Sequence, residues 1–358
     1  MRIMHVLGTR PNFVKMAPVI AAVERDLPEA EQVIVHTGQH YDRNMSEIFF
    51  EQLGVPAPDH MLEVGSGSHA VQTAKVMERL EPLLTNERPD LLLVPGDVNS
   101  TLAAALTGAK LDIPVGHIES GLRSWDREMP EEINRVLTDQ IADTLYVHSE
   151  EAIGNLKREG IPESRIHFVG NTMIDSLVAL EDRFRTLESC RGFGLDPGGF
   201  LLVTLHRPAL VDGPLLFEAI SALNLVAADI PVLFPVHPRT RARLTGEVEI
   251  APSLHLVDPA GYLEFLSLEA DAAAVLTDSG GIQEETTYLD VPCFTLRDNT
   301  ERPVTVELGT NTLLGLDPAR IAEIPGLITD GGRIASEPPP LWDGKAAERI
   351  VAQIKQHA

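Results

Sequence analysis

Short apolar runs alternate with amphipathic stretches along the first half of the chain. The apolar runs predict strands at residues 3–7, 32–37, 91–94, 114–118, 144–147 and 166–169. Between them, apolar residues at helical spacing predict helices, among them 44–52, 68–84, 101–110, 131–142, 150–159 and one through 173–180. Strands that alternate with helices in this way predict a parallel sheet.

The pattern is interrupted once and then resumes. Residues 181–199 are first charged and then rich in Gly and Pro, which indicates a boundary between domains. Further strands are predicted at 200–205, 232–234, 256–257, 273–276 and 293–296, with helices at 214–227, 261–269, 318–329 and 345–356. The sequence therefore predicts an α/β protein with two Rossmann-like, doubly wound domains, over 1–180 and 190–341.

Length and composition narrow the class of protein. A chain of 358 residues is too long for one ordinary core, which agrees with two domains. The net charge of −24 argues against a nucleic-acid or anionic-membrane partner, although a local cluster of cations could still bind phosphate. No apolar run approaches the roughly 20 residues that a membrane span needs, and no signal-peptide pattern is present. We expect a cytoplasmic protein.

The two cysteines, Cys190 and Cys293, are too few for a disulfide framework or a zinc site. Cys293 lies in an apolar run and is expected to be a small buried hydrophobe. His117 and His237 lack neighbouring residues of ligand type, so we expect no metal. Trp125 and Tyr262 are interpreted as packing residues.

Three acidic residues lie at the tips of successive elements in the stretch 95–135. Asp97 follows the strand at 91–94, Glu119 follows the strand at 114–118, and Glu131 falls in the first turn of a helix that begins near Pro130. In open α/β sheets, ligands bind beyond the carboxyl ends of the strands. Clustered carboxylates suit proton transfer at carbon, where a base and an acid are both needed. Alternatively, the three residues are helix caps and a turn residue.

Two glycine-containing loops are candidate anion sites. Gly8 to Pro11 places Arg10, with Lys15 one turn later, at a helix N-terminus, where N–H groups favour anions. Neither a GxGxxG fingerprint nor a P-loop is present. The alternative is a surface turn with two solvated cations. Glu132 and Arg135, three residues apart, are expected to form a solvated or bracing ion pair.

The second loop lies in the second half. Asp278-Ser279-Gly280-Gly281 precedes a helix, so its N–H groups and the Ser279 hydroxyl could bind a diphosphate. Glu285 would repel phosphate and better suits ribose hydroxyls, and Arg302 beyond the next strand could share the site. His206 with Arg207 at a strand tip could pair with a leaving phosphate. An ordinary helix cap and a structural histidine are the alternatives.

Taken together, these motifs resemble the non-hydrolysing UDP-N-acetylglucosamine 2-epimerase family. The resemblance covers nearly the whole chain, in order. It rests on Gly8-Thr9-Arg10-Pro11 with Lys15, Gly96-Asp97, Gly116-His117-Ile118-Glu119-Ser120-Gly121-Leu122-Arg123, Pro130-Glu131-Glu132-Ile133-Asn134-Arg135, Gly170-Asn171-Thr172, His206-Arg207, Pro235-Val236-His237, Thr277 to Glu285 and Thr300-Glu301-Arg302-Pro303.

The resemblance implies a fold like that of the GT-B glycosyltransferases, with the active site in a cleft between the domains and the C-terminal helix, within 342–358, packed back on the first domain. It implies interconversion of UDP-GlcNAc and UDP-ManNAc by elimination of UDP and its re-addition to a 2-acetamidoglucal. It implies no metal, no nicotinamide or other cofactor, and a homodimer. The implied setting is cell-surface polysaccharide biosynthesis.

By position in the family motifs, the implied catalytic residues are Asp97, Glu119, Glu131 and His206. The implied UDP-binding residues are Arg10, Lys15, Ala260 (through its backbone), Phe265, Ser279, Gly280, Gly281, Glu285 and Arg302. Which carboxylate removes the C2 proton stays open.

The chain departs from the family pattern in two places. Pro208 follows His206-Arg207, where many members carry an acidic residue. The neighbours of Gln39, His40 and His237 differ from the usual pattern of an activating second UDP-GlcNAc site. The substrate could also be a modified UDP-sugar such as a diacetamido-uronic acid. A UDP-sugar glycosyltransferase, which would need an acceptor, and release of UDP by hydrolysis are further alternatives.

Overall fold

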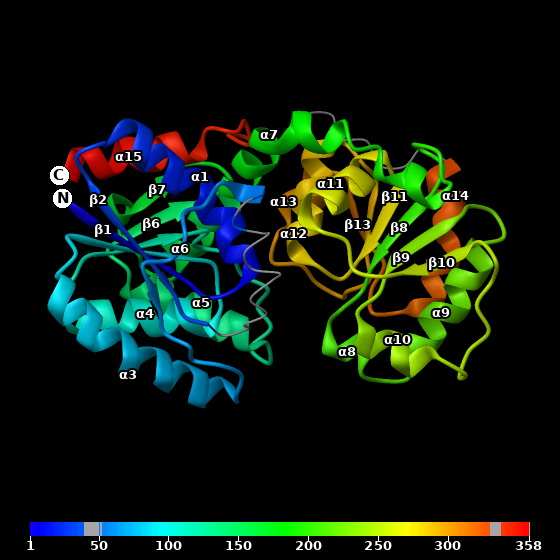
Figure 1. Ribbon diagram of the computed structural model, residues 1–358, viewed down its shortest axis with the longest axis horizontal. Coiled ribbons are helices and arrows are strands. Elements are labelled where there is room, and N and C mark those ends of the chain that lie inside the picture. Colours follow the sequence, from blue (N-terminus) through cyan, green and yellow to red (C-terminus); the bar gives the residue numbers. More distant parts are fainter. Residues whose placement is uncertain (39–49, 51, 330–337, 358) are drawn as a thin grey trace. The chain divides into compact units, whose positions relative to one another are not determined.

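The computed structural model describes residues 1–38, 50, 52–329 and 338–357, and these divide into two compact units (Figure 1). Unit 1 comprises Met1–Ala179 and Pro340–Ala358, and unit 2 comprises Leu180–Pro339. The helix predicted at 44–52 lies almost wholly outside the described residues, as do Gln39 and His40.

Unit 1 is built on a seven-stranded parallel sheet. Its order is β3 (His60–Met61), β2 (Glu31–His36), β1 (Arg2–Leu7), β4 (Leu91–Pro95), β5 (Val115–Ile118), β6 (Thr144–Val147) and β7 (Ile166–Phe168). The strand order reverses between β1 and β4, so the loops after these two strands diverge to opposite sides. Such a switch point is where doubly wound sheets bind ligands.

Helices cover both faces of this sheet. They are α1 (Arg10–Asp26), α3 (His69–Glu87), α4 (Asn99–Lys110), α5 (Pro130–Ile141), α6 (Glu150–Arg158) and α15 (Ala346–His357), with a 3-10 turn η1 (Glu163–Arg165). Helix α7 (Thr172–Arg185) belongs to this unit as far as Ala179, and its remainder belongs to unit 2. Alternate side chains of β1 point to opposite faces of the sheet, and each face has its own hydrophobic core. Met4 and Val6 pack with residues of α3 and α4, whereas Ile3 and Leu7 pack with residues of α1 and α15. This two-sided burial explains why the strands read as unbroken apolar runs.

The C-terminal helix α15 belongs to unit 1, where Figure 1 shows it alongside α1. Ile350 and Ile354 join the core under α1. The Asp175 carboxylate of α7 accepts hydrogen bonds from the first backbone N–H groups of α15, those of Ala346 (3.0 Å) and Ala347 (2.7 Å). A carboxylate at this position satisfies amide groups that a helix N-terminus leaves unpaired.

Unit 2 repeats the same strand order in a six-stranded parallel sheet. The order is β10 (Leu254–Val257), β9 (Val232–Pro235), β8 (Leu201–Thr204), β11 (Ala274–Thr277), β12 (Cys293–Thr295) and β13 (Asn311–Leu313). Its helices are α8 (Pro208–Val211), α9 (Leu215–Val226), α10 (Pro238–Leu244), α11 (Tyr262–Asp271), α12 (Gly280–Leu289), α13 (Val304–Glu307) and α14 (Ile324–Thr329), with 3-10 turns η2 (Ser189–Phe193) and η3 (Pro318–Glu323). The switch point lies between β8 and β11.

The predicted fold class, with parallel sheets in both halves, is confirmed. Two strands were not predicted: β3 has two residues and β13 has three, too short for a periodic signal. The helix predicted at 318–329 is instead a 3-10 turn, η3, followed by α14. Cys293 is fully buried, as predicted. Among the described residues, no helix is both long enough and apolar enough to cross a membrane.

Candidate functional site

The switch point of unit 1 is organised by the loop after β1. The Asn12 side chain accepts hydrogen bonds from the backbone N–H groups of Gly8 (3.0 Å) and Thr9 (3.1 Å), and it donates one to the carbonyl of Pro95 at the end of β4 (3.2 Å). A Cβ atom on Gly8 would lie 2.7 Å from the Ser100 side chain. Only glycine therefore fits where the two loops meet. Arg10 begins α1 and is exposed.

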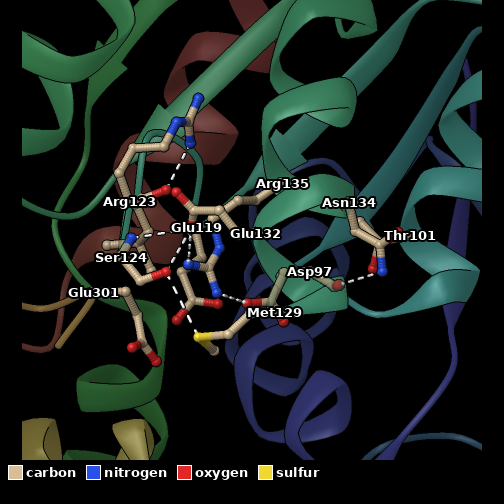
Figure 2. Close-up of polar contacts among 12 residues, drawn as sticks. Asp97, Thr101, Glu119, Arg123, Ser124, Met129, Glu132, Asn134, Arg135 and Glu301 are labelled. Atoms are coloured by element: carbon tan, nitrogen blue, oxygen red, sulfur yellow. Dashed lines mark hydrogen bonds and ion pairs between the residues drawn. The ribbon is translucent and has the colours of Figure 1, made fainter. Parts of the chain in front are cut away.

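Asp97 lies just after the end of β4, and a buried arginine binds its carboxylate. The Arg135 guanidinium donates to the Asp97 carboxylate (2.6 Å) and to the Glu132 carboxylate (2.6 Å), as Figure 2 shows. Glu132 also accepts from the backbone N–H and the hydroxyl of Ser124 (both 2.9 Å). Arg135 and Glu132 are both 2% exposed. The predicted pair of Glu132 and Arg135 is thus a buried brace and not a solvated pair.

Glu119 stands at the tip of the next strand, β5. Its carboxylate forms an ion pair with the Lys15 ammonium of α1, and both side chains are buried. The Glu119 backbone has a φ of +67°, in the left-handed region that non-glycine residues rarely occupy. Such a conformation persists only where the surroundings impose it, and it is concentrated at functional sites.

Asp97 and Glu119 are neighbours across the sheet. The N–H of Gly96 donates to the carbonyl of Ile118 (2.9 Å), and a Cβ atom on Gly96 would lie 3.4 Å from the Glu119 carboxylate and 3.1 Å from the Lys15 ammonium. Two carboxylates, each paired with its own cation, therefore lie at adjacent strand tips.

Glu131, the third candidate carboxylate, lies in the first turn of α5 and is half-buried. Its side chain makes no hydrogen bond or ion pair with the residues that the structure describes. A carboxylate at this position is stabilised by the positive end of the helix dipole and keeps its oxygens available to a ligand.

A small pocket opens beyond β5, β6 and β7 of unit 1. Lys15, Glu119, Tyr146, His148 and Asn171 are among its lining residues. Sequence reasoning missed His148, although it directly follows the strand β6, the position that singled out Asp97 and Glu119. It also missed Asp139 of α5, whose carboxylate is buried against His117 (2.7 Å).

In unit 2, His206 and Arg207 follow β8 at the switch point and are held by Asp278, which follows β11. The Asp278 carboxylate accepts from the backbone N–H groups of His206 (2.9 Å) and Arg207 (2.8 Å) and lies 3.1 Å from the His206 ring. Burial would raise the pKa of Asp278, but the His206 side chain and these N–H groups outweigh it and lower the pKa. The His206 ring is 59% exposed and so available to a ligand.

The glycine loop that was predicted to bind an anion lies at the N-terminus of α12. Ser279 is the N-cap residue, and Gly280 and Gly281 begin the helix. A Cβ atom on Gly280 would overlap the Arg302 guanidinium and lie 2.7 Å from the Glu301 carboxylate. Arg302 is buried, donates to Glu301 (2.6 Å) and pairs with Glu284 (3.0 Å). The structure thus brings Arg302 against the predicted glycine loop, as the sequence analysis anticipated.

Glu285 lies on α12 one turn beyond this loop and is buried. The Tyr262 hydroxyl donates to its carboxylate (3.0 Å). Burial, the largest cause, raises the pKa of Glu285 to about 8, and burial together with the nearby Glu285 also raises the pKa of Glu269 on α11. A protonated carboxyl can both donate and accept hydrogen bonds, which suits sugar hydroxyls. Tyr262 is therefore more than the packing residue that was predicted.

The remaining candidates are placed as follows. Ala260, just before α11, and Phe265, in its first turns, are half-buried apolar residues. Both pack against one of the hydrophobic cores of unit 2. His237 caps α10, where its Nδ1 accepts from the N–H of Arg239 (3.2 Å). The prediction that Trp125 is a packing residue is wrong: its side chain is 60% exposed, with the Arg158 guanidinium 5.0 Å from the ring centroid. Its position in a polar loop with a φ of +61° explains the difference.

The chemistry that each unit supports follows from these groups. Unit 1 offers three carboxylates and two cations around strand tips, a set suited to proton transfer and anion binding. Unit 2 offers a helix N-terminus with an arginine, suited to phosphate. Within either unit taken alone, the described residues contain no group of three His, Cys, Asp or Glu side chains close enough together to hold one metal ion.

Comparisons with known proteins agree with one another. A family model described as UDP-N-acetylglucosamine 2-epimerase matches residues 22–355. The chain is 43% identical to a UDP-N-acetylglucosamine 2-epimerase of Methanocaldococcus jannaschii over 98% of each chain. It is 41% identical to a UDP-2,3-diacetamido-2,3-dideoxy-D-glucuronate 2-epimerase of Pseudomonas aeruginosa over 99% of each. A crystal structure of the M. jannaschii epimerase with UDP-GlcNAc and UDP superposes with a TM-score of 0.89 at 42% identity, covering 99% of this chain and 100% of the other.

Proposed function

The chain belongs to the UDP-N-acetylglucosamine 2-epimerase family, and we propose that it interconverts UDP-GlcNAc and UDP-ManNAc. The family resemblance predicted from the sequence is thereby confirmed, as is an enzyme of the epimerase class. The observation that carries the specific reaction is the pair of carboxylates at the tips of β4 and β5. Asp97 and Glu119 are each fixed by a cation, beside a helix start that carries Glu131.

The proposed reaction is an elimination followed by a re-addition. A carboxylate takes the proton from C2 of the sugar, the bond between C1 and the UDP oxygen breaks, and a double bond forms between C1 and C2. UDP leaves with the electron pair of the broken bond between C1 and its oxygen. In the second half, a proton is delivered to the other face of C2, and the UDP oxygen attacks C1. Epimerisation needs an acid or base on each face of C2, which is the role we assign to Asp97, Glu119 and Glu131.

The Lys15 ammonium is proposed to serve two anions in turn. In the structure it neutralises Glu119. A diphosphate that binds near Lys15 and Arg10 would compete for this charge and release the Glu119 carboxylate from its ion pair. Binding of the substrate would then itself prepare the site for proton removal.

We assign the rest of the recognition of UDP to unit 2. The N–H groups of Ser279, Gly280 and Gly281 and the Arg302 guanidinium are proposed to hold the diphosphate, with His206 close to its leaving oxygen. Glu285, kept protonated by burial, is proposed to bind the ribose hydroxyls, and the backbone of Ala260 with the Phe265 ring is proposed to hold the uracil. A helix N-terminus with an adjacent arginine is a general anion site, which supports this assignment.

The test is product identification from purified protein without any acceptor. UDP-GlcNAc should give UDP-ManNAc, and each sugar nucleotide should lead to the same final mixture. Conversion of UDP-2,3-diacetamido-2,3-dideoxy-D-glucuronate alone would transfer the proposal to that substrate class. Net release of UDP with free ManNAc, or turnover only after an acceptor is added, would contradict it.

A homodimer, a cytoplasmic location and a role in cell-surface polysaccharide biosynthesis stay proposals that rest on the family. Sedimentation of the purified protein as a monomer at the concentration used for the activity assay would contradict the first of them. Recovery of the protein outside the cytoplasmic fraction of its native cell would contradict the second.

A further inference from the structure

A buried histidine links the two strand tips that carry Asp97 and Glu119. His117 lies in β5 and is fully buried. Its Nδ1 lies 2.7 Å from the Asp139 carboxylate of α5, and its Nε2 lies 2.7 Å from the carbonyl oxygen of Gly96. Both distances are those of strong hydrogen bonds.

Both partners of the ring can only accept. A backbone carbonyl has no proton to donate, and the Asp139 carboxylate is already committed as an acceptor. Its second oxygen accepts from the N–H of Gly121 (3.0 Å) and from the Arg123 guanidinium (2.8 Å). A neutral imidazole carries one N–H and would leave a lone pair facing one of these oxygens. Burial would raise the pKa of Asp139, but its interactions with His117 and Arg123 outweigh burial and lower the pKa, so Asp139 is ionised. With Asp139 ionised, the hydrogen-bond pattern calls for a proton on both ring nitrogens.

The surrounding charges agree with this requirement. A chain of charged groups leads away from the ring. Asp139 of α5 contacts His117, Arg123 from the loop after β5 binds Asp139, and Glu159 at the end of α6 binds the Arg123 guanidinium at 2.6 and 2.7 Å. The adjacent carboxylates are committed elsewhere, Glu119 to Lys15 and Asp97 to Arg135. Asp139, Arg123 and Glu159 leave one net negative charge, with Asp139 and Arg123 buried and the Glu159 side chain 19% exposed. A positively charged His117 balances it.

We propose that His117 is held permanently as an imidazolium and that, with Asp139, it is a positioning residue for both strand tips. The Asp139 carboxylate holds the chain at His117 and again at Gly121, on either side of Glu119, whose backbone is in the left-handed region. From the other ring nitrogen, His117 holds the carbonyl of Gly96, the residue before Asp97. The part of the proposal that concerns catalysis rests on the proposed function, but the charge of the ring does not.

The chain offers a matched control in the same sheet. His5 of β1 is equally buried, but its Nε2 meets the Gln32 amide (2.9 Å), and burial lowers the pKa of His5 to about 4. His5 is therefore neutral where His117 is charged. Substituting either residue disturbs the sheet, but only His117 contacts the candidate site.

The charge is tested on the wild-type protein by NMR with 15N-labelled histidine. At neutral pH, both ring nitrogens of His117 should show a one-bond coupling to hydrogen, and His5 should show only one such nitrogen. A single protonated nitrogen in His117 would overturn the proposal. Two couplings in a protein that does not turn over UDP-GlcNAc would support the charge of His117 and contradict the proposed function instead.

The positioning role is tested by kinetics of His117→Gln, Asp139→Asn and His5→Gln, compared at equal amounts of folded protein. Misplacing reacting groups by about 1 Å can lower a rate about 100-fold. We expect a fall in kcat of that order for His117→Gln with KM within a few-fold, and an unchanged kcat for His5→Gln. In Asp139→Asn, which removes the ionised partner of the ring, His117 should show only one protonated ring nitrogen at neutral pH. Equal kcat values for His117→Gln and His5→Gln would contradict the role.

Discussion

The three candidate carboxylates of unit 1 differ in their partners, although their sequence contexts look alike. Asp97 is bound by the buried Arg135, Glu119 by the buried Lys15, and Glu131 by no residue that the structure describes. We propose from these partners that Asp97 and Glu119 act in proton removal and that Glu131 keeps its oxygens available to a ligand.

Removing any one of these carboxylates should stop the reaction without unfolding the protein. General acid–base groups contribute roughly 10²- to 10⁴-fold to a rate. Asp97→Asn, Glu119→Gln and Glu131→Gln should each lower kcat by about 10³-fold in an assay of UDP-ManNAc formation. The matched control is Glu163→Gln, which removes an exposed carboxylate that pairs with Lys157. Near-normal turnover in all three site variants would refute the acid–base assignment.

Glu285 and Glu269 are expected to make the unliganded protein less stable as the pH rises. Burial raises the pKa of Glu285 to about 8 and also raises that of Glu269, whereas an unfolded chain restores the model-peptide value of 4.5. The folded state therefore holds these protons to higher pH than the unfolded state. The resulting stabilisation is complete below the unfolded pKa and is lost as the pH rises through the folded pKa.

Thermal unfolding between about pH 5 and about pH 8 measures this effect. The unfolding midpoint of the wild type should fall over this range, and Glu269→Gln, which cannot ionise, should reduce the fall. Glu218→Gln, at an exposed position of α9, should leave the fall unchanged. The account is wrong if Glu269→Gln and Glu218→Gln follow the same curve as the wild type.

At the scale of elements, helix α12 shows what a sequence can predict. The order Ser-Gly-Gly before an apolar helical pattern predicted an anion site, and the structure places Arg302 against its glycines. The buried pairs could not be predicted. Arg135 and Asp97 are 38 residues apart, and His117 and Asp139 are 22 apart, so their contacts depend on how α5 packs on the sheet. Among the buried pairs, the exception is Glu132 with Arg135, which could be predicted from the sequence because the two residues are one helical turn apart.

Gly280 is expected to be required for binding of UDP because the Arg302 side chain occupies the place of a Cβ atom. In Gly280→Ala the guanidinium must move, and overpacking of this kind typically costs about 1–3 kcal/mol. We expect calorimetry to show UDP affinity reduced about tenfold or more. Gly326→Ala, in α14 of the same unit, adds a methyl group with no atom within 4 Å and should bind UDP normally. Equal affinities would contradict the close approach seen in the structure.

At the scale of the whole molecule, one strand order is used twice. In both sheets the order in which strands are added reverses between the first and the fourth strand of the sheet. These are β1 and β4 in unit 1, and β8 and β11 in unit 2. The candidate residues gather at these points because loops diverge there and leave backbone groups open to a ligand. The alternation of apolar runs and helical patterns predicted parallel sheets in both halves, but it did not predict the order of the strands. It missed β3 and β13, which are defined by pairing with β2 and β12 and not by any pattern of their own.

We propose that the carboxylates of unit 1 exchange the proton on C2 of the sugar. Proton NMR of the purified protein with UDP-GlcNAc in deuterated water tests it most directly. The account predicts that UDP-ManNAc appears and that deuterium enters C2 of both sugar nucleotides, at rates that fall together in the Asp97, Glu119 and Glu131 variants. UDP-ManNAc that forms while C2 keeps its original hydrogen would contradict the account.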